Sequence, residues 1–171
     1  MERFQDGRVG IGKGPEFDMA ILAGQFVPSF LERTPGTLLI DLAGDFRLND
    51  ESAHQRYYGE HPCFSLNETF TYAFPEANRD AIAEARRLSC PGCFATGSLV
   101  ACAGLAGTGA IAGDIVSFAV TGSSGSGASP LPGTHHPGRS ANLCAYKVFT
   151  HQHEPEIAQQ LASMGEGNKF R

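Results

Sequence analysis

A cysteine stands at the start of a predicted helix, in the run Pro91-Gly92-Cys93. The residues after it, 95–106, are rich in alanine, leucine, valine and glycine, which predicts a buried helix with Cys93 at its first turn. The positive end of the helix dipole and the free backbone N–H groups there favour a thiolate, the nucleophilic form of cysteine. The run therefore predicts a cysteine nucleophile, with a packed core cysteine as the structural alternative.

Two histidines that could take the proton of this thiol follow later in the chain, at His151 and His153. An imidazole is suited to moving protons near neutral pH. Both residues lie between a predicted strand and a predicted helix, where side chains are held but accessible; the alternative is that one of them only caps the helix. A thiol with such a histidine is typical of acyl transfer through a thioester.

Other residues of this region could bind an anion or a metal ion. His135 and His136 are adjacent, so their side chains diverge, and no acidic or cysteine partner has ligand spacing nearby. We therefore expect no metal site. Arg139 and Lys147 could hold an anionic substrate, with solvated surface charges as the alternative.

The chain has five cysteines, an odd number, and lacks the two C-x-x-C units that frame many zinc sites. Cys90 and Cys93 form a single such unit. A thiol–disulfide protein that uses this pair is a further alternative, and it predicts that Cys90→Ser abolishes activity.

The composition describes a globular protein that carries a net negative charge. The 171 residues suffice for a core, hydrophobic residues make up 42% and charged residues 18%, and the formal charge is −5. Scattered basic residues argue against a nucleic-acid partner. No apolar stretch reaches the ~20 residues of a membrane span, and residues 1–10 carry charges in place of a signal core, so we expect no membrane partner and a cytoplasmic location.

Apolar runs and turn residues predict strands and helices in an α/β order. Two acidic residues, Asp41 and Asp45, lie at and beyond the C-terminal end of the predicted strand 37–42, where open α/β sheets bind their ligands. The alternating run 114–121 is the strongest strand pattern, and the glycine-rich stretch that follows reads as an ordered loop beside a substrate rather than a flexible linker. Asn78 is a plausible helix cap. The predicted strands are 19–23, 37–42, 87–90, 114–121 and 142–149; the predicted helices are 25–33, 49–58, 75–87 and 93–107 and one that starts at 154, and 59–71 is a predicted loop.

Five ordered motifs between residues 18 and 161 resemble those of N-acetyl-gamma-glutamyl-phosphate reductases, a family of the semialdehyde dehydrogenase superfamily. The motifs are Asp41-Leu42-Ala43-Gly44-Asp45-Phe46-Arg47-Leu48, Tyr57-Tyr58-Gly59, Phe74-Pro75-Glu76-Ala77-Asn78-Arg79, Pro91-Gly92-Cys93-Phe94-Ala95-Thr96 and His151-Gln152-His153-Glu154-Pro155-Glu156-Ile157.

The resemblance implies a reductase that uses NADPH/NADP to convert an acyl phosphate to an aldehyde in arginine biosynthesis. It implies an α/β fold with part of a dinucleotide-binding (Rossmann-like) domain at residues 1–92 and part of an α+β substrate and dimerisation domain at residues 93–171. Cys93 would form the thioester, His151 or His153 would act as acid/base, and Glu156 would orient the imidazole. A homo-oligomer and a small acyl-phosphate substrate are the expected partners.

The resemblance also implies binding residues. Tyr146 and Arg47 lie in matching segments, and the Ser/Gly-rich loop 122–127 would lie beside the substrate. The expected substrate-binding residues are Arg47, Ser123, Ser124, Gly125, Arg139 and Lys147, and the expected cofactor-binding residues are Gly92, Thr96 and Gly125.

Departures from the family pattern bear on activity and substrate. The glycine-rich nucleotide fingerprint and the last strands of the family are absent, so we expect an incomplete version of a protein about twice as long. N-acetylglutamyl phosphate is the expected substrate, with a carrier-bound aminoadipyl phosphate or an N-succinylglutamyl phosphate as alternatives that the run 134–139 does not decide. The alternative of another class is a catalytically silent binding or dimerisation module.

Overall fold

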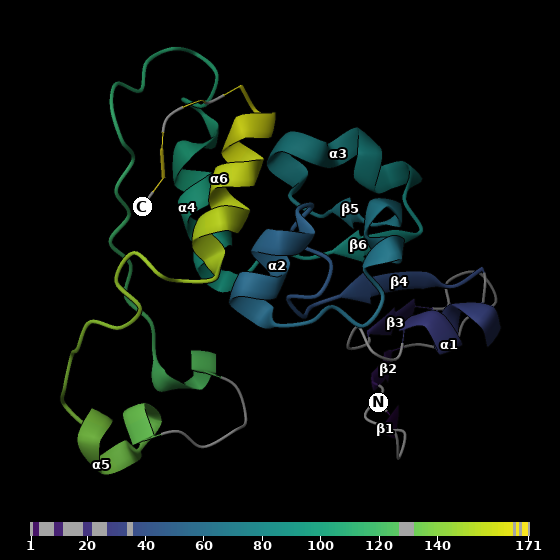
Figure 1. Ribbon diagram of the computed structural model, residues 1–171, viewed down its shortest axis with the longest axis horizontal. Coiled ribbons are helices and arrows are strands. Elements are labelled where there is room, and N and C mark those ends of the chain that lie inside the picture. The colour runs from purple at the N-terminus through teal and green to yellow at the C-terminus, as the bar shows by residue number, and fades with distance from the viewer. Residues whose placement is uncertain are drawn as a thin grey trace.

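The computed structural model describes residues 2–3, 9–11, 19–21, 27–33, 36–126, 132–165, 167 and 169–170. Its centre is a six-stranded sheet in the order β1-β2-β3-β4-β6-β5 (Figure 1). The first three strands pair antiparallel, and β3, β4, β6 and β5 pair in parallel. The strands are β1 Glu2–Arg3, β2 Val9–Ile11, β3 Met19–Ile21, β4 Leu38–Asp41, β5 Thr71–Tyr72 and β6 Arg87–Ser89.

The parallel strands and the helices between them confirm the predicted α/β character. Each of these strands forms within or next to a short apolar run. The strands predicted at 37–42 and 87–90 are present as β4 and β6, and the described part of 19–23 is β3. Asp41 pairs with Ser89 in the register of β4 and β6, and Tyr72 pairs with Ser89 in that of β5 and β6. These three residues therefore share one edge of the sheet, the carboxyl edge, where open α/β sheets place their functional groups.

The predicted helices lie at or near their expected positions, and the differences concern Asn78, the predicted loop 59–71 and the short helix His136–Arg139, which was not predicted. The helix predicted at 75–87 begins after Phe74, and Asn78 is a kink inside it (φ −118°, ψ 23°) whose amide donates to the Tyr72 carbonyl at 3.0 Å. The prediction that Asn78 caps this helix was therefore wrong, because its side chain donates to a backbone carbonyl outside the helix. A 3₁₀ helix, Phe64–Thr69, lies within the predicted loop. The α-helices are α1 Val27–Arg33, α2 Glu51–Tyr58, α3 Pro75–Glu84, α4 Cys93–Ala103, α5 His136–Arg139 and α6 His153–Ser163.

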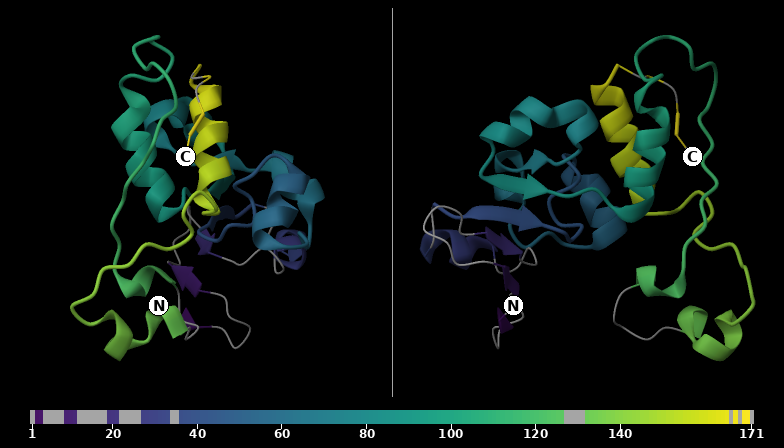
Figure 2. Two further views of the ribbon diagram at one scale, coloured as in Figure 1. Left: turned by 60° about the vertical axis from the view of Figure 1, so that its left-hand side comes forward. Right: turned by 180° about the vertical axis from the view of Figure 1, so that it is seen from behind.

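Helices α4 and α6 lie side by side in all views and enclose the larger core (Figures 1 and 2). The small residues of α4 permit close approach, and its buried Leu99 packs with Ile157 and Leu161 of α6. Phe74, which precedes α3, and Phe170 complete this cluster. The packing fixes the first turns of the two helices next to one another and at the carboxyl edge of the sheet.

The strands predicted at 114–121 and 142–149 are wrong for this structure. Of the first run only Ile115 forms a bridge, to Phe170, and beyond it Phe118 is 87% exposed. An alternating pattern becomes a strand only when another strand pairs with it, and none does so among the described residues. In the second run Lys147 and Phe149 have positive φ (46° and 53°), which interrupts an extended chain. The two runs instead form an arm that leads to α5 and back (Figure 2).

Candidate active site

Cys93 is the first residue of α4 and is exposed. Strand β6 ends at Ser89, and Pro91 and Gly92 turn the chain into the helix, with Gly92 as its N-cap. The thiol therefore stands where the sequence predicted it, at a helix N-terminus, and exposure excludes the packed core cysteine. The Thr96 hydroxyl and amide both bond the Gly92 carbonyl, at 3.0 and 2.8 Å, which secures this first turn.

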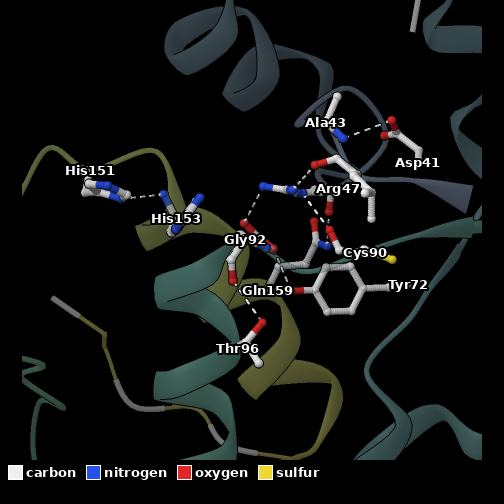
Figure 3. Close-up of polar contacts among 12 residues, drawn as sticks. Asp41, Ala43, Arg47, Tyr72, Cys90, Gly92, Thr96, His151, His153 and Gln159 are labelled. Carbon is white, nitrogen blue, oxygen red and sulfur yellow. Dashed lines mark hydrogen bonds and ion pairs between the residues drawn. The ribbon is translucent and has the colours of Figure 1, made fainter. Parts of the chain in front are cut away.

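The His153 imidazole lies directly against Gly92 (Figure 3). A Cβ at residue 92 would overlap Nε2 and the neighbouring ring carbons, so only glycine allows this approach. The ring is 7% exposed, and burial, followed by the charges of His151 and Arg47, lowers the pKa of His153 to about 4. The imidazole is therefore neutral at pH 7 and lies next to the turn that carries Cys93.

Glu156 lies one turn further along α6, on the same face as His153. It is 0% exposed, and its Oε1 accepts hydrogen bonds from the Gly92 amide at 2.9 Å and from the Tyr72 hydroxyl at 2.7 Å. Arg47 Nη1 lies 3.9 Å from Oε2. Burial raises the pKa of Glu156, while the bond from Tyr72, the charge of Arg47 and the bond from Gly92 oppose that rise.

The expectation that Glu156 orients the imidazole stays a prediction. Its Oε1 bonds Tyr72 and Gly92, and the buried Nδ1 of His153 has no hydrogen-bond partner in the described part of the chain. Both side chains reach the Gly92 turn from the first turn of α6. Glu156 thus acts on the backbone in front of Cys93.

Arg47 is buried, and its guanidinium joins two strand ends. Nε donates to the Cys90 carbonyl and Nη2 to the Leu42 carbonyl, both at 2.7 Å. Gln159 of α6 donates to the Arg47 carbonyl at 3.0 Å. These bonds tie the ends of β4 and β6 to α6 behind the site (Figure 3). The substrate-binding role expected of Arg47 stays a prediction, beside this structural role.

His151 lies beside His153, with ring centroids 4.6 Å apart, and stands edge-on to Phe94 at 5.2 Å. Its Nδ1 accepts the His153 amide at 3.1 Å, so the neutral ring carries its proton on Nε2. Burial, followed by the charge of Lys147, lowers the pKa of His151. His151 therefore offers a hydrogen-bond donor, and His153 is the histidine that touches the Gly92 turn.

A cavity of about 430 Å³ lies between the arm and the first turn of α6. Its lining includes Phe94, the two histidines His151 and His153, and the two basic residues Arg139 and Lys147. The structure therefore brings both residues that were expected to bind an anionic substrate to the same cavity as the histidines. Lys147 also donates to Gln152 at 2.6 Å. The expected substrate loop follows Thr121, which lines the cavity, and Ser123, Ser124 and Gly125 lie in a 3₁₀ helix, Ser123–Ser126. The roles of these three residues stay predictions.

Sequence reasoning missed Tyr72. Its hydroxyl reaches Glu156, a residue 84 positions away in the chain. The available signal was its place at the end of a short strand directly before the Phe74-Pro75-Glu76 motif, since side chains at the carboxyl edge gather with those of neighbouring strands. Without the pairing of β5 with β6, that edge was not predictable.

Comparison with known proteins places this site in a family. The semialdehyde dehydrogenase dimerisation domain matches residues 93–170, and this match begins at Cys93. The chain belongs to the N-acetyl-gamma-glutamyl-phosphate reductase family of semialdehyde dehydrogenases.

Individual relatives match most of the chain. A protein of Methanopyrus kandleri named N-acetyl-gamma-glutamyl-phosphate reductase is 39% identical over 84% of this chain and 41% of its own length. One of the same name from Methanocaldococcus jannaschii is 39% identical over 81% of this chain and 40% of its own. A [LysW]-L-2-aminoadipate 6-phosphate reductase of Deinococcus radiodurans is 40% identical over 74% and 37%. The chain spans about two fifths of the length of these curated relatives.

The described residues also bear on other kinds of site. None of the helices found there has the length and apolar character needed to cross a membrane. The same residues contain no group of three or more histidine, cysteine, aspartate or glutamate side chains that could hold a metal ion.

Proposed function

We propose that this chain carries the thioester chemistry of an NADPH-dependent reductase that converts N-acetyl-gamma-glutamyl phosphate to N-acetylglutamate semialdehyde and phosphate, as in arginine biosynthesis. The observation that carries the proposal is the exposed Cys93 at the N-terminus of α4, on a turn that a neutral histidine contacts. The names of the relatives support the same reaction.

The proposed acylation uses residues of this site alone. Cys93 Sγ attacks the acyl carbon, a C–S bond forms, the C–O bond to phosphate breaks, and inorganic phosphate leaves. His153 takes the thiol proton, because its ring is neutral and lies against the preceding residue. Arg139 and Lys147 line the cavity that His151 and His153 also line, and they would attract the anionic substrate there.

The second half of the reaction requires a hydride, which NADPH supplies to the thioester carbon when it is bound. The surface beside Cys93 is open: Thr96 and Gly97 are exposed, and a Cβ at Gly97 would meet nothing within 4 Å. Gly92 and Thr96 would hold the nicotinamide end there, with Gly125 as the third expected contact. His153 then returns its proton or keeps the thiolate neutralised as the aldehyde leaves.

The remaining features of the proposal follow the resemblance. Residues 1–92 would belong to a dinucleotide-binding domain, which the parallel strands β3, β4 and β6 support, and residues 93–171 to the substrate and dimerisation domain. A homo-oligomer in the cytoplasm is the expected form. A carrier-bound aminoadipyl phosphate is the second candidate substrate, favoured by the Deinococcus radiodurans relative.

Covalent acylation tests the first step without the cofactor. The chain is mixed with N-acetyl-gamma-glutamyl phosphate made in situ by a kinase, and the modified residue is located by mass spectrometry beside the Cys93→Ser variant. We expect one acyl group on Cys93, phosphate release, and neither in the variant. Acylation of another cysteine, or none, would contradict the proposal.

Phosphate-dependent reduction of NADP by N-acetylglutamate semialdehyde tests the complete reaction in reverse. We expect activity in the chain and a loss of at least a thousandfold in Cys93→Ser, because no other group replaces the nucleophile. Acylation without NADP reduction would overturn the claim that this chain performs the hydride step.

A further inference from the structure

A buried carboxylate joins three segments of the chain directly behind Cys93. Glu156 of α6 accepts, on the single atom Oε1, the amide of Gly92 and the hydroxyl of Tyr72. Gly92 immediately precedes Cys93, and Tyr72 is the last residue of β5. The oxygen that holds the backbone in front of the thiol is therefore itself held by the tyrosine.

We propose that Tyr72 is a positioning residue for Cys93, which acts through Glu156 to fix the Gly92 amide and with it the first turn of α4. The inference rests on the proposed function, in which Cys93 is the nucleophile. A nucleophile must be held within a fraction of an ångström of its productive position, and backbone bonds supported by a second layer of hydrogen bonds provide that precision.

The placement of Tyr72 suits this role because its backbone is fixed independently of its hydroxyl. Tyr72 pairs with Ser89 in the parallel pairing of β5 and β6, which fixes its backbone. The Asn78 side chain donates a hydrogen bond to the Tyr72 carbonyl at 3.0 Å. Its ring packs against the core cluster of α4 and α6. The hydroxyl points from this fixed frame to Glu156, and burial, followed by the Glu156 charge, raises the pKa of Tyr72, so the hydroxyl stays a donor.

The charged and titratable groups around Glu156 come from each element packed against it. Arg47, after β4, lies 3.9 Å from Oε2 and balances the carboxylate. Tyr58 of α2 and Tyr72 of β5 both feel the Glu156 charge, and His153 lies one turn away on α6. A charged carboxylate accepts hydrogen bonds more strongly than a neutral carboxyl, so loss of the Glu156 charge loosens the Gly92 amide.

The experiment removes the hydroxyl alone, with Tyr72→Phe. The matched control is Tyr57→Phe, the same chemical change at a residue of α2 that stacks with Arg56 and lies outside this network. Two readouts are followed from pH 4 to pH 9 on the intact chain. The first is the Gly92 amide resonance in NMR spectra, and the second is the rate of Cys93 alkylation by iodoacetamide, located by mass spectrometry.

In Tyr72→Phe we expect the midpoint of the Gly92 amide titration to rise by about one pH unit, because Glu156 loses a bond that stabilises its charged form. The low-pH inflection of Cys93 alkylation should move with it, and Tyr57→Phe should leave both unchanged. In a Glu156→Gln background Tyr72→Phe should shift neither readout.

An unchanged midpoint in Tyr72→Phe, or an equal shift in the Glu156→Gln background, would overturn the proposal. If Tyr72→Phe does not fold, the Gly92 amide resonance of the unmodified chain is followed against pH. The proposal requires this resonance to titrate together with the Glu156 carboxyl, and a resonance that does not would overturn it. Neither readout uses NADPH or an acyl phosphate. A failed reductase assay would therefore count against the proposed function and leave this result in place.

Discussion

The contact between Gly92 and His153 makes the substitution Gly92→Ala a direct test of the site geometry. The added Cβ would overlap the imidazole ring. The backbone angles of Gly92, φ −65° and ψ 158°, suit alanine, so no backbone strain adds to the cost. In the folded state the effect therefore reports the overlap with His153.

The magnitude follows from two opposing contributions. Overpacking a tight contact lowers the free energy of unfolding by about 1–3 kcal/mol. Replacing glycine restricts the unfolded chain and returns about 0.4–1 kcal/mol. We expect a net loss of about 1–2 kcal/mol, which lowers the Tm of a chain of this length by about 2–8 °C.

Gly97→Ala is the matched control, because Gly97 lies in the same helix and a Cβ there would meet nothing within 4 Å. Alanine in a helix interior should raise the free energy of unfolding by about 0.5–1 kcal/mol. The two substitutions are chemically identical and are expected to have opposite signs.

Thermal and urea unfolding of both variants, of His153→Ala, and of Gly92→Ala combined with His153→Ala, measure the effect. Removing the imidazole removes the overlap, so the double variant should show a coupling energy of at least about 1 kcal/mol. A Gly92→Ala variant as stable as Gly97→Ala, or a coupling energy near zero, would refute the contact.

Three further predictions concern the same edge of the sheet. Burial raises the pKa of Asp41 to about 6, so the folded state holds a proton that the unfolded state releases near pH 4, and the contribution of Asp41 to the free energy of unfolding should fall by about 2–3 kcal/mol between pH 4 and pH 6. The lowered pKa of His153 acts in the opposite direction over this range in the native chain and in Asp41→Asn alike, so urea unfolding should show the difference in stability between these two chains change by that amount, and a constant difference would contradict the prediction. Arg47→Met should lower the free energy of unfolding, measured by urea unfolding, by about 3–5 kcal/mol, because it leaves the buried Glu156 carboxylate without its positive partner. A variant that loses activity at unchanged stability would instead favour contact of Arg47 with the substrate. Cys90→Ser should keep nearly full acylation of Cys93, because the atom of Cys90 used in the site is its carbonyl oxygen, and abolished acylation would favour the dithiol alternative.

Much of the local structure was predictable from the residues. The helix at Cys93 follows from a proline-glycine turn before a run of small apolar residues, and α6 follows from acidic residues and a proline in its first turn. The parallel strands β4 and β6 follow from short apolar runs. Cys93 and the two histidines His151 and His153 could be singled out because their residue types and their places at helix starts suit the chemistry, whereas Glu156 was implied by the family resemblance.

The residues 114–121 show where this reasoning fails. Their alternation is a true property of the sequence, yet strand formation needs hydrogen bonds from a second strand, and the described residues provide only the bridge from Ile115 to Phe170. Asn78 is a second case, because its side chain found a carbonyl in three dimensions that competed with capping.

The sequence by itself determined which segments are helices near the site, that a thiol begins one of them, and that two histidines and a glutamate begin another. Only the tertiary structure decided what these groups touch. Glu156 meets Gly92 across 64 positions and Tyr72 across 84, and His153 rests on a glycine rather than on the glutamate of its own helix. Helix starts depend on neighbours within a few residues, whereas these contacts depend on how α4, α6 and β5 pack, and that packing is set by the whole chain at once.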